Sequence, residues 1–468
     1  MVGTIELTDV GDDLNDMISA LPEGVLLHIL SLLPTKDAVR TSVLATKWKH
    51  LWKYLSAFHF ENVDPRYEST QQNQNAANCL LDLVGRLLDK SNKIERLSVE
   101  IFKISVDRNK VSYLISSAMK HKIQYLRLSL GDSNDQFMLP HSFSTFTSLN
   151  ELWLGLEFTL HVPSGICFPS LKKLVASNAT FANENSVQQL FSGCPVLEEL
   201  DLDDCYWKNI EQVNVAISTL RILRIRSNML CVAYEHDITL KIDAVNLLTL
   251  YCRCIPTIEF IPVNLTSLVD AYIDLWCGFP HSKQYVAYCA FKLLRGLNSI
   301  KSLTMCSTTL QCLYHTKNTL HLLPLFHNLT HLNVCCLTSK NTNEVLLNIL
   351  RKTPKLKVLT IPGVVLNNMD NEDLMLNSVP YCFKYSLNQL CFSYFNGDEH
   401  AIKFIMFILN NSPHLEEVKI YCSRLLLADK EKMTDVWNRL EDACAERCAN
   451  KFIDNNTESS DDDEDEQD

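Results

Sequence analysis

A six-residue pattern, apolar-x-x-apolar-x-apolar, recurs along most of the chain. Its starts lie about 27 residues apart on average, a period typical of solenoids, in which each structural repeat packs only on its neighbours. Leu247 and Leu265 fit least closely, because Cys252 and Asp270 stand where a larger apolar residue is expected. The pattern begins at Ile94, Ile123, Leu149, Leu171, Leu197, Leu220, Leu247, Leu265, Ile300, Leu329, Leu356, Leu387 and Leu415.

Proline introduces four of these repeats in the form Pro-x-Leu, at Pro169, Pro195, Pro354 and Pro413. Helical patterns at Ser186–Phe191, Glu344–Arg351 and His400–Leu409 end shortly before such a proline. Proline ends a helix and keeps the residue before it extended. We therefore expect one strand plus one helix or loop per repeat, stacked into a solenoid with a parallel sheet on its inner face. The alternative is a series of unrelated α/β segments with chance leucines.

The two positions that flank the second leucine of each predicted strand point out of the inner face, because side chains alternate along a strand. Tyr125 and Trp153 on adjacent repeats, with Arg127 beside them, have the composition of an interface hot spot. The following repeats carry both charges, so no substrate class follows. The alternative is that these positions are covered by the N-terminal segment or by loops. The predicted target-binding residues are Arg96, Tyr125, Arg127, Glu151, Trp153, Glu199, Asp201 and Arg224.

The N-terminal segment follows a helical pattern instead. Pro22 can begin a helix, because the first turn needs no N–H there, and Pro34 ends it. Thr35 can cap a second short helix, and a third follows over Val43–Trp52. Three short helices bury little surface, which favours docking onto something else. The alternative is an ordinary helical start to a larger domain.

This segment resembles an F-box, in the version found at the head of plant proteins with leucine-rich repeats. The matching residues are Leu21-Pro22, Ile29-Leu30, Leu33-Pro34, Val39-Arg40-Thr41-Ser42, Val43-Leu44, Trp48 and Leu51-Trp52. Gly24 departs from the family pattern, which usually has an acidic residue there, and Thr46-Lys47 replaces a Ser or Lys followed by Arg. The resemblance implies docking on a Skp-type adaptor and, through it, on cullin and RING subunits. The adaptor-facing or helix-fixing set is Leu21, Pro22, Val25, Leu26, Ile29, Leu30, Leu33, Val39, Leu44, Trp48 and Trp52.

The region from Val379 to Ile420 reads as strand, Asn396-Gly397 turn, helix and strand. It resembles the FBD domain that follows the repeats in many of these plant proteins. The matching residues are Val379-Pro380, Cys382, Leu387, Leu390, Gly397, Ile408-Leu409, Leu415-Glu416 and Ile420. Its last strand is expected to close the array, and an amphipathic helix over Asp429–Lys451 is expected to cover the end.

The expected fold class is α/β, with an N-terminal helical F-box, an irregular leucine-rich-repeat solenoid and an FBD-type α/β unit at the end. A first strand is predicted at Ala57–Val63 and an exposed loop at Arg66–Ala77. The predicted boundaries are 1–13 for a flexible leader, 14–56 for the F-box, 57–378 for the repeats, 379–453 for the FBD-like unit with its capping helix, and 454–468 for a disordered acidic tail.

Composition narrows the class of protein. Of 468 residues, 47% are apolar and 21% charged, which is typical of a folded chain. The net charge of −12 argues against a nucleic-acid footprint, which needs a basic face. No basic-then-apolar signal begins the chain, and no apolar run approaches the roughly 20 residues of a membrane span. We therefore expect a protein of the cytoplasm or nucleus, without membrane contact, whose 18 cysteines are reduced.

Motifs for catalysis are missing from the sequence. It has no phosphate-binding glycine loop, zinc-protease helix or nucleophile elbow, and only 12 glycines. Cys444 and Cys448 lie one helical turn apart but lack the spacing of a zinc site, and nothing around any cysteine marks a nucleophile. We expect no cofactor, no metal and no catalytic residue.

The resemblance therefore implies a non-catalytic substrate-recognition subunit of an SCF-type E3 ubiquitin ligase, in which the F-box holds the adaptor and the repeats hold a target protein. The alternative is a leucine-rich-repeat scaffold that does not recruit a ligase, which Gly24 and Thr46 would favour. No basic pocket for an anionic ligand is evident from the sequence.

Overall fold

The computed structural model describes residues 18, 20–61, 70–101, 104, 106–131, 136–140, 143, 146–207, 210–227, 238–254, 258–276, 283–315, 317–335, 342–362, 379–445 and 452–454. One sheet of 15 strands runs through it in sequence order, with every neighbouring pair parallel. Its strands are β1 (Ala57–Glu61), β2 (Arg96–Ile101), β3 (Tyr125–Leu130), β5 (Glu151–Leu156), β7 (Lys173–Ser177), β9 (Glu199–Asp203), β11 (Ile222–Arg226), β13 (Thr249–Cys254), β15 (Asp270–Leu275), β16 (Ser302–Cys306), β17 (His331–Cys335), β18 (Val358–Pro362), β19 (Gln389–Phe395), β20 (Glu417–Cys422) and β21 (Phe452–Asp454).

The apolar pattern fixes the register of this sheet. At every predicted start except Leu265, a strand begins two residues later, and the leucines are buried against those of the next repeat. The prediction at Leu265 is wrong by three residues, because β15 uses Leu268, Ala271 and Ile273 to match the core positions of β13. Leu55 is the start of an additional repeat, since β1 pairs in register with β2.

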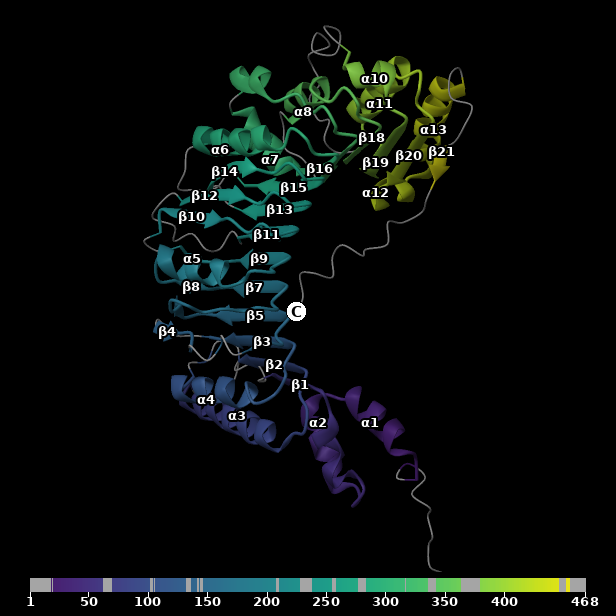
Figure 1. The fold of residues 1–468 in the computed structure, drawn as a ribbon. Helices are drawn as coiled ribbons and strands as arrows, with labels where there is room; N and C mark the ends of the chain where they lie inside the picture. Colours follow the sequence, from purple (N-terminus) through teal and green to yellow (C-terminus); the bar gives the residue numbers. More distant parts are fainter. Residues whose placement is uncertain are drawn as a thin grey trace, which may run out of the picture.

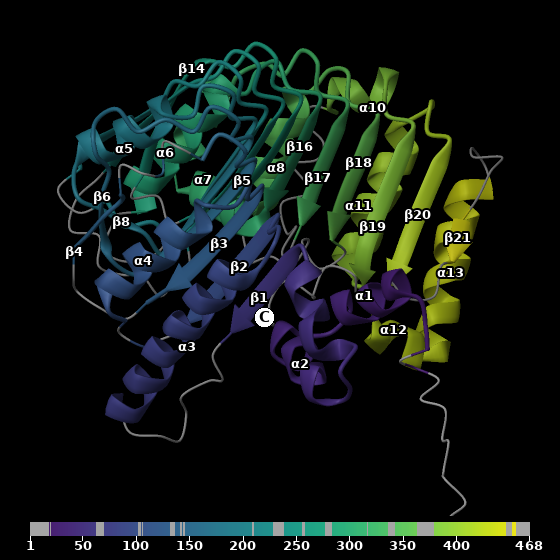
Figure 2. The same cartoon turned by 60° about the horizontal axis from the view of Figure 1, so that its bottom comes forward.

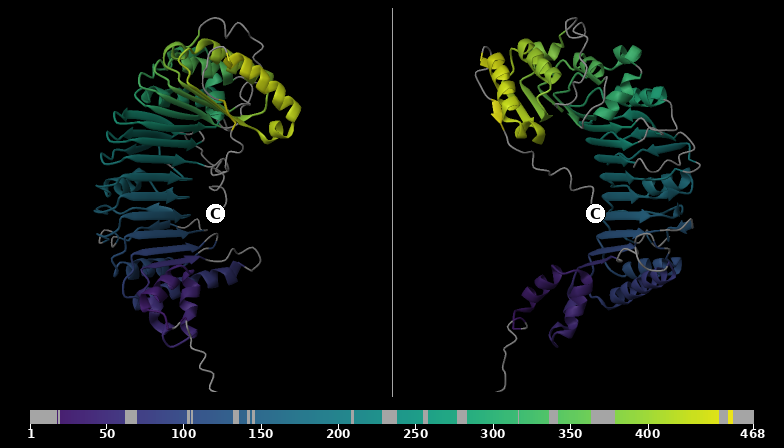
Figure 3. Two further views of the ribbon diagram at one scale, coloured as in Figure 1. Left: turned by 90° about the vertical axis from the view of Figure 1, so that its right-hand side faces the viewer. Right: turned by 180° about the vertical axis from the view of Figure 1, so that it is seen from behind.

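Helices and short strands cover the other side of the sheet, and the stack bends so that both of its ends turn toward the strand side (Figures 1 and 3). Figure 2 shows the strands running side by side with α6, α7 and α8 behind them. These helices are α3 (Thr70–Lys90), α4 (Arg108–Ala118), α5 (Glu184–Ser192), α6 (Lys283–Gly296), α7 (Ser307–Tyr314), η4 (Lys317–Leu322) and α8 (Thr342–Arg351). The helices predicted before Pro195 and Pro354 are therefore confirmed as α5 and α8.

Two small parallel sheets on this outer side were not predicted. The first joins β4 (Gln136–Met138), β6 (Thr159–His161) and β8 (Thr180–Phe181). The second joins β10 (Gln212–Val215), β12 (Ile238–Asp243) and β14 (Ile258–Asn264). The loop predicted at 66–77 is wrong from residue 70 on, because α3 begins there. Its apolar stripe, Ala77, Leu81, Val84 and Leu88, is buried at helical spacing, and the Gln- and Asn-rich stretch is the first turns of that helix.

The N-terminal head consists of α1 (Glu23–Ser31), α2 (Thr35–Arg40) and two 3₁₀ helices, η1 (Thr41–Val43) and η2 (Trp48–Tyr54). Pro22 precedes α1 as predicted. Thr35 does not cap α2; its Oγ1 accepts a hydrogen bond of 2.8 Å from the His59 N–H of β1. The third helix is 3₁₀ rather than α. Thr35 thereby ties the head to the edge strand of the long sheet.

At the C-terminal end, α10 (Tyr381–Tyr385) precedes β19, and α11 (Glu399–Asn411), the helix predicted before Pro413, joins β19 to β20. Gly397 makes the predicted turn at φ +69°, where only glycine is unstrained. After α12 (Arg424–Ala428), α13 (Lys430–Ala445) packs on α11, and Arg439 pairs both carboxylate oxygens of Glu399 at 2.8 and 2.9 Å.

The prediction that β20 closes the array is wrong, because β21 pairs with it. Strand β21 also includes Asp454, the first residue of the predicted tail. The leader, the rest of the tail and the stretch 446–451 of the predicted capping helix lie outside the described residues.

Candidate functional site

The head contains the predicted adaptor-binding residues, and they divide by exposure. Those that build its core are buried, those at its edge are partly buried, and the remainder are exposed apolar side chains or proline. The buried residues are Leu26, Leu30, Trp48 and Trp52; the partly buried ones are Leu21, Ile29 and Val39; the exposed ones are Pro22, Val25, Leu33 and Leu44. The buried group therefore fixes the helices, and the exposed group offers the most surface to a partner.

The most exposed apolar side chain of the head is Val43, which the predicted set omitted. It is 85% exposed, Leu44 beside it is 68% exposed, and Leu32 after α1 is 73% exposed. Adjacent exposed apolar residues on a small folded unit mark a docking surface. A charge at Leu30, by contrast, would unfold the head rather than remove a contact, because Leu30 is fully buried.

The strand side of the long sheet, which we call the inner face, presents three rows of side chains in register. The first row runs through Arg96, Tyr125, Glu151, Lys173, Glu199 and Ile222. The second runs through Ser98, Arg127, Trp153, Val175, Asp201, Arg224, Tyr251 and Tyr272. The third runs through Glu100, Ser129, Gly155, Ser177, Asp203, Arg226, Arg253 and Asp274. All predicted target-binding residues thus share one surface.

Arginine and aromatic side chains stack on the N-terminal part of the inner face. The Arg96 guanidinium lies 4.0 Å from the centre of the Tyr125 ring. Arg127 and the Lys173 ammonium lie 5.0 and 5.3 Å from the centre of the Trp153 ring. Among the described residues the buried Trp153 Nε1 has no hydrogen-bond partner. Cations near aromatic faces attract the ring, so these rows hold their side chains in place before any target arrives.

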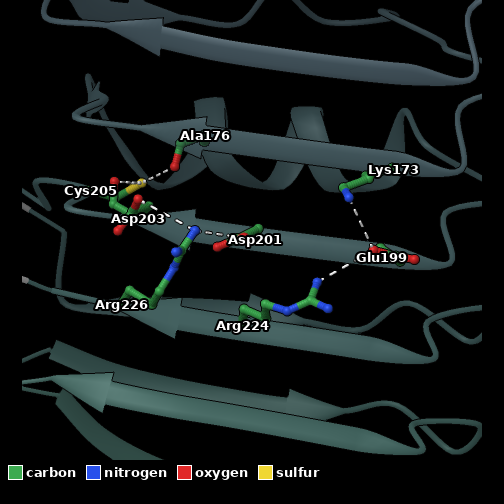
Figure 4. Close-up of polar contacts among 8 residues, drawn as sticks. All are labelled: Lys173, Ala176, Glu199, Asp201, Asp203, Cys205, Arg224 and Arg226. Carbon is green, nitrogen blue, oxygen red and sulfur yellow. Dashed lines mark hydrogen bonds and ion pairs between the residues drawn. The ribbon is translucent and has the colours of Figure 1, made fainter. Parts of the chain in front are cut away.

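A charge network occupies the middle of the inner face (Figure 4). Glu199 lies between Lys173 and Arg224, with N–O distances of 3.5 and 3.4 Å. Arg226 pairs with Asp201 at 2.9 Å and with Asp203 at 3.4 Å. Burial raises the pKa of both Asp201 and Asp203, and the nearby Arg226 opposes that shift. These charges are paired with one another, although the buried Asp201 Oδ1 and Arg226 Nε have no hydrogen-bond partner among the described residues.

An aromatic pair on the next repeats was not predicted from the sequence, because outward-pointing positions were assigned only as far as β11. The Tyr251 and Tyr272 rings stack with centres 4.3 Å apart. Arg253 pairs with the buried Asp274 at 3.6 Å, and the Tyr272 hydroxyl lies 3.1 Å from the Cys306 Sγ. The sequence could have predicted this pair, because a tyrosine stands at the outward position of both β13 and β15.

A cavity of about 520 Å³ lies where the head meets the inner face. One wall is the connection from α1 to α2, including Leu33 and Pro34, and the other carries His59, Arg96 and Arg127. Its walls come from segments distant in sequence, so no local motif could reveal it. The sequence made no such basic pocket evident; in the structure Arg96 and Arg127 line this cavity, and so does Leu33, which was predicted to face the adaptor.

The buried cysteines behave as core residues. Burial raises the pKa of Cys194 to about 12 and that of Cys382 to about 11, and Cys205 donates its S–H to the Ala176 carbonyl (Figure 4). Such thiols stay protonated at neutral pH and are poor nucleophiles. The expectation that all cysteines are reduced fails at Cys312, which is in a disulfide.

Two kinds of feature are absent from the described residues. No group of three or more His, Cys, Asp or Glu side chains in that part of the chain could hold a metal ion. Likewise, no described helix is long and apolar enough to cross a membrane.

Comparisons with known proteins match three separate stretches of the chain. Residues 18–60 match the model of the F-box domain, and residues 376–420 match that of the FBD. Residues 111–256 match a model described as the LRR repeats of FBD-associated F-box protein At5g56370.

Similar curated proteins come from Arabidopsis thaliana. The F-box/FBD/LRR-repeat protein At1g78750 is 28% identical over 92% of this chain and 95% of its own length. The putative FBD-associated F-box protein At3g50710 is 28% identical over 90% of this chain and 96% of its own length. The F-box/LRR-repeat protein At4g14103 is 27% identical over 80% of this chain and 95% of its own length. The likeness therefore runs along nearly the whole of each chain.

Proposed function

The chain belongs to the plant F-box/FBD/leucine-rich-repeat proteins, and from that premise we propose that it is the substrate-recognition subunit of an SCF-type E3 ubiquitin ligase. The F-box domain implies binding to a Skp-type adaptor. In the proposed complex the adaptor holds cullin and RING subunits, and the inner face of the repeats holds the target protein. The chain itself would contribute no catalytic group; it would raise the local concentration of the target near the charged ubiquitin carrier.

One observation carries this proposal: the exposed apolar surface of Val43 and Leu44 on a head whose own core is complete. Leu26, Leu30, Trp48 and Leu51 are buried within the head, so Val43 and Leu44 add nothing to its packing. Exposing two large apolar side chains is unfavourable unless a partner covers them. The head stands at one end of the stack (Figure 1), so a partner there leaves the inner face open to a target.

Adaptor binding by the full chain tests the proposal. Purified protein is titrated with a Skp-type adaptor by calorimetry, and a Val43→Asp/Leu44→Asp variant is compared with Leu425→Asp. Leu425 is the matched control, since it is 82% exposed on α12 at the opposite end of the molecule. We expect submicromolar binding that the double variant loses by at least about 100-fold, the effect of removing a hot spot, and that Leu425→Asp retains.

If the folded wild-type protein does not bind the adaptor, the chain is a repeat scaffold without ligase recruitment. Gly24 is the residue to inspect in that case. A Cβ there would meet no atom of the chain within 4 Å, so its missing side chain removes nothing from the head's own packing and could affect only a partner contact.

A further inference from the structure

The cavity at the junction of head and repeats combines one paired acidic group with a basic group that has no ion-pair partner among the described residues. Glu100, at its base, is 7% exposed. Its carboxylate accepts a hydrogen bond from Ser98 Oγ at 2.9 Å and forms an ion pair with Arg127 Nε at 3.1 Å, and the His59 ring lies 3.7 Å away. Arg127 therefore neutralises Glu100, and this pair leaves the cavity without a net negative charge.

Arg96 differs from every other arginine of the inner face. Arg127, Arg224, Arg226 and Arg253 each pair with a carboxylate. No carboxylate of the described residues lies within ion-pair distance of Arg96, whose side chain is exposed at the cavity. Its guanidinium carbon lies 4.0 Å from the centre of the Tyr125 ring, and its N–H groups have no hydrogen-bond acceptor among the described residues. A planar fork of N–H donors suits a carboxylate or a phosphate.

The opposite wall of the cavity is apolar. Leu32 and Leu33 follow α1 and line the cavity together with Pro34, and the two leucines are 73% and 38% exposed. A ligand here would meet an anion-binding fork on one side and apolar side chains on the other. An acidic side chain within a peptide that also carries an apolar residue has this chemistry.

We propose that this cavity binds an acidic side chain, either a carboxylate or a phosphorylated serine, on a segment of the target protein. Arg96 holds the anion, Tyr125 holds Arg96, and the Leu32–Pro34 wall receives the neighbouring apolar side chain. The inference rests on the proposed function for the source of the segment and adds the chemical class that the receptor selects.

The test begins with a display library of random ten-residue peptides, selected on the full-length protein. We expect enrichment of Asp or Glu next to an apolar residue. An enriched peptide is then titrated against the wild type, Arg96→Gln and Arg86→Gln. Arg86 is the matched control, because it is an exposed arginine on α3 without an ion pair among the described residues. Losing a charge-assisted bidentate contact should weaken binding at least tenfold for Arg96→Gln and leave Arg86→Gln unchanged.

A second arm separates the two sources of the anion. The acidic residue of the enriched peptide is replaced by phosphoserine and, separately, by glutamine. Tighter binding of the phosphopeptide assigns the site to phosphoserine, whereas tighter binding of the original peptide assigns it to a carboxylate. The glutamine peptide, which has no negative charge at this position, should not bind in either case. Selection without acidic enrichment, or equal binding by Arg96→Gln and wild type, would overturn the proposal. Adaptor titration of Arg96→Gln keeps the two proposals apart, because that variant should retain adaptor binding in full.

Discussion

The hydrogen bond from His59 to Thr35 predicts how firmly the head is attached to the repeats. Thr35 is 5% exposed and accepts the His59 N–H of the edge strand β1 at 2.8 Å. Thr35→Val keeps the shape of the side chain and replaces the hydroxyl with a methyl group, so the His59 N–H loses its acceptor. An unsatisfied, partly buried donor costs about 1–2 kcal/mol, which corresponds to amide exchange about 5- to 30-fold faster at His59.

Hydrogen exchange measured by NMR or mass spectrometry reports the opening of this hydrogen bond at the level of single segments. We expect faster exchange over β1 and α2 in Thr35→Val, with the strands from β5 onward unchanged. Thr41→Val is the control, because the Thr41 hydroxyl donates its hydrogen bond to the Ala38 carbonyl within the head rather than to a group of β1. If the His59 amide exchanges at the same rate in Thr35→Val and Thr41→Val, then apolar packing rather than this hydrogen bond attaches the head.

Three further predictions concern the core and the inner face. Leu30→Ala should cost about 2–4 kcal/mol within the head, because Leu30 is fully buried, and should weaken adaptor binding together with loss of exchange protection in α1. Arg127→Gln should lower the free energy of unfolding, measured in urea, by about 1–2 kcal/mol, since Glu100 would remain buried without its cation. Burial raises the folded-state pKa of Asp201, so its contribution to stability increases as the pH falls from that raised value toward the ordinary pKa of aspartate. The wild type should therefore gain stability over this window relative to Asp201→Asn, and equal slopes of unfolding free energy against pH would contradict the shift.

The long sheet was predictable because its signal is local and repeated. A leucine or isoleucine two residues before a strand specifies both the strand and its register, as at Leu149 and Leu197. The error at Leu265 arose because two overlapping frames fit the same stretch, and pairing with β13 selects the one that begins at Leu268. The helical start at Thr70 was missed because polar residues on the solvent side of a helix have the composition of a loop.

The binding surfaces were predictable only in part, for a similar reason. Alternation along a strand places Arg127 and Trp153 on the inner face from sequence alone. The exposure of Val43 depends on how η1 packs against the head, and the cavity depends on Leu33 meeting Arg96 across a long separation in sequence. The lack of an ion-pair partner for Arg96 among the described residues could not be predicted either, because it depends on which side chains lie around Arg96 in the folded chain.

The strictly parallel register of the long sheet has a consequence for how such chains can change in length. Each strand of the stack pairs only with the strands of adjacent repeats, and all repeats enter the ladder at the same position. A complete repeat can therefore be removed or duplicated while the strands on either side rejoin, whereas loss of part of a repeat would break the register. Each such event would move the two ends apart or together by one strand spacing, about 4.8 Å. A lineage of these chains could thus adjust its reach in fixed increments while the docking head is inherited intact.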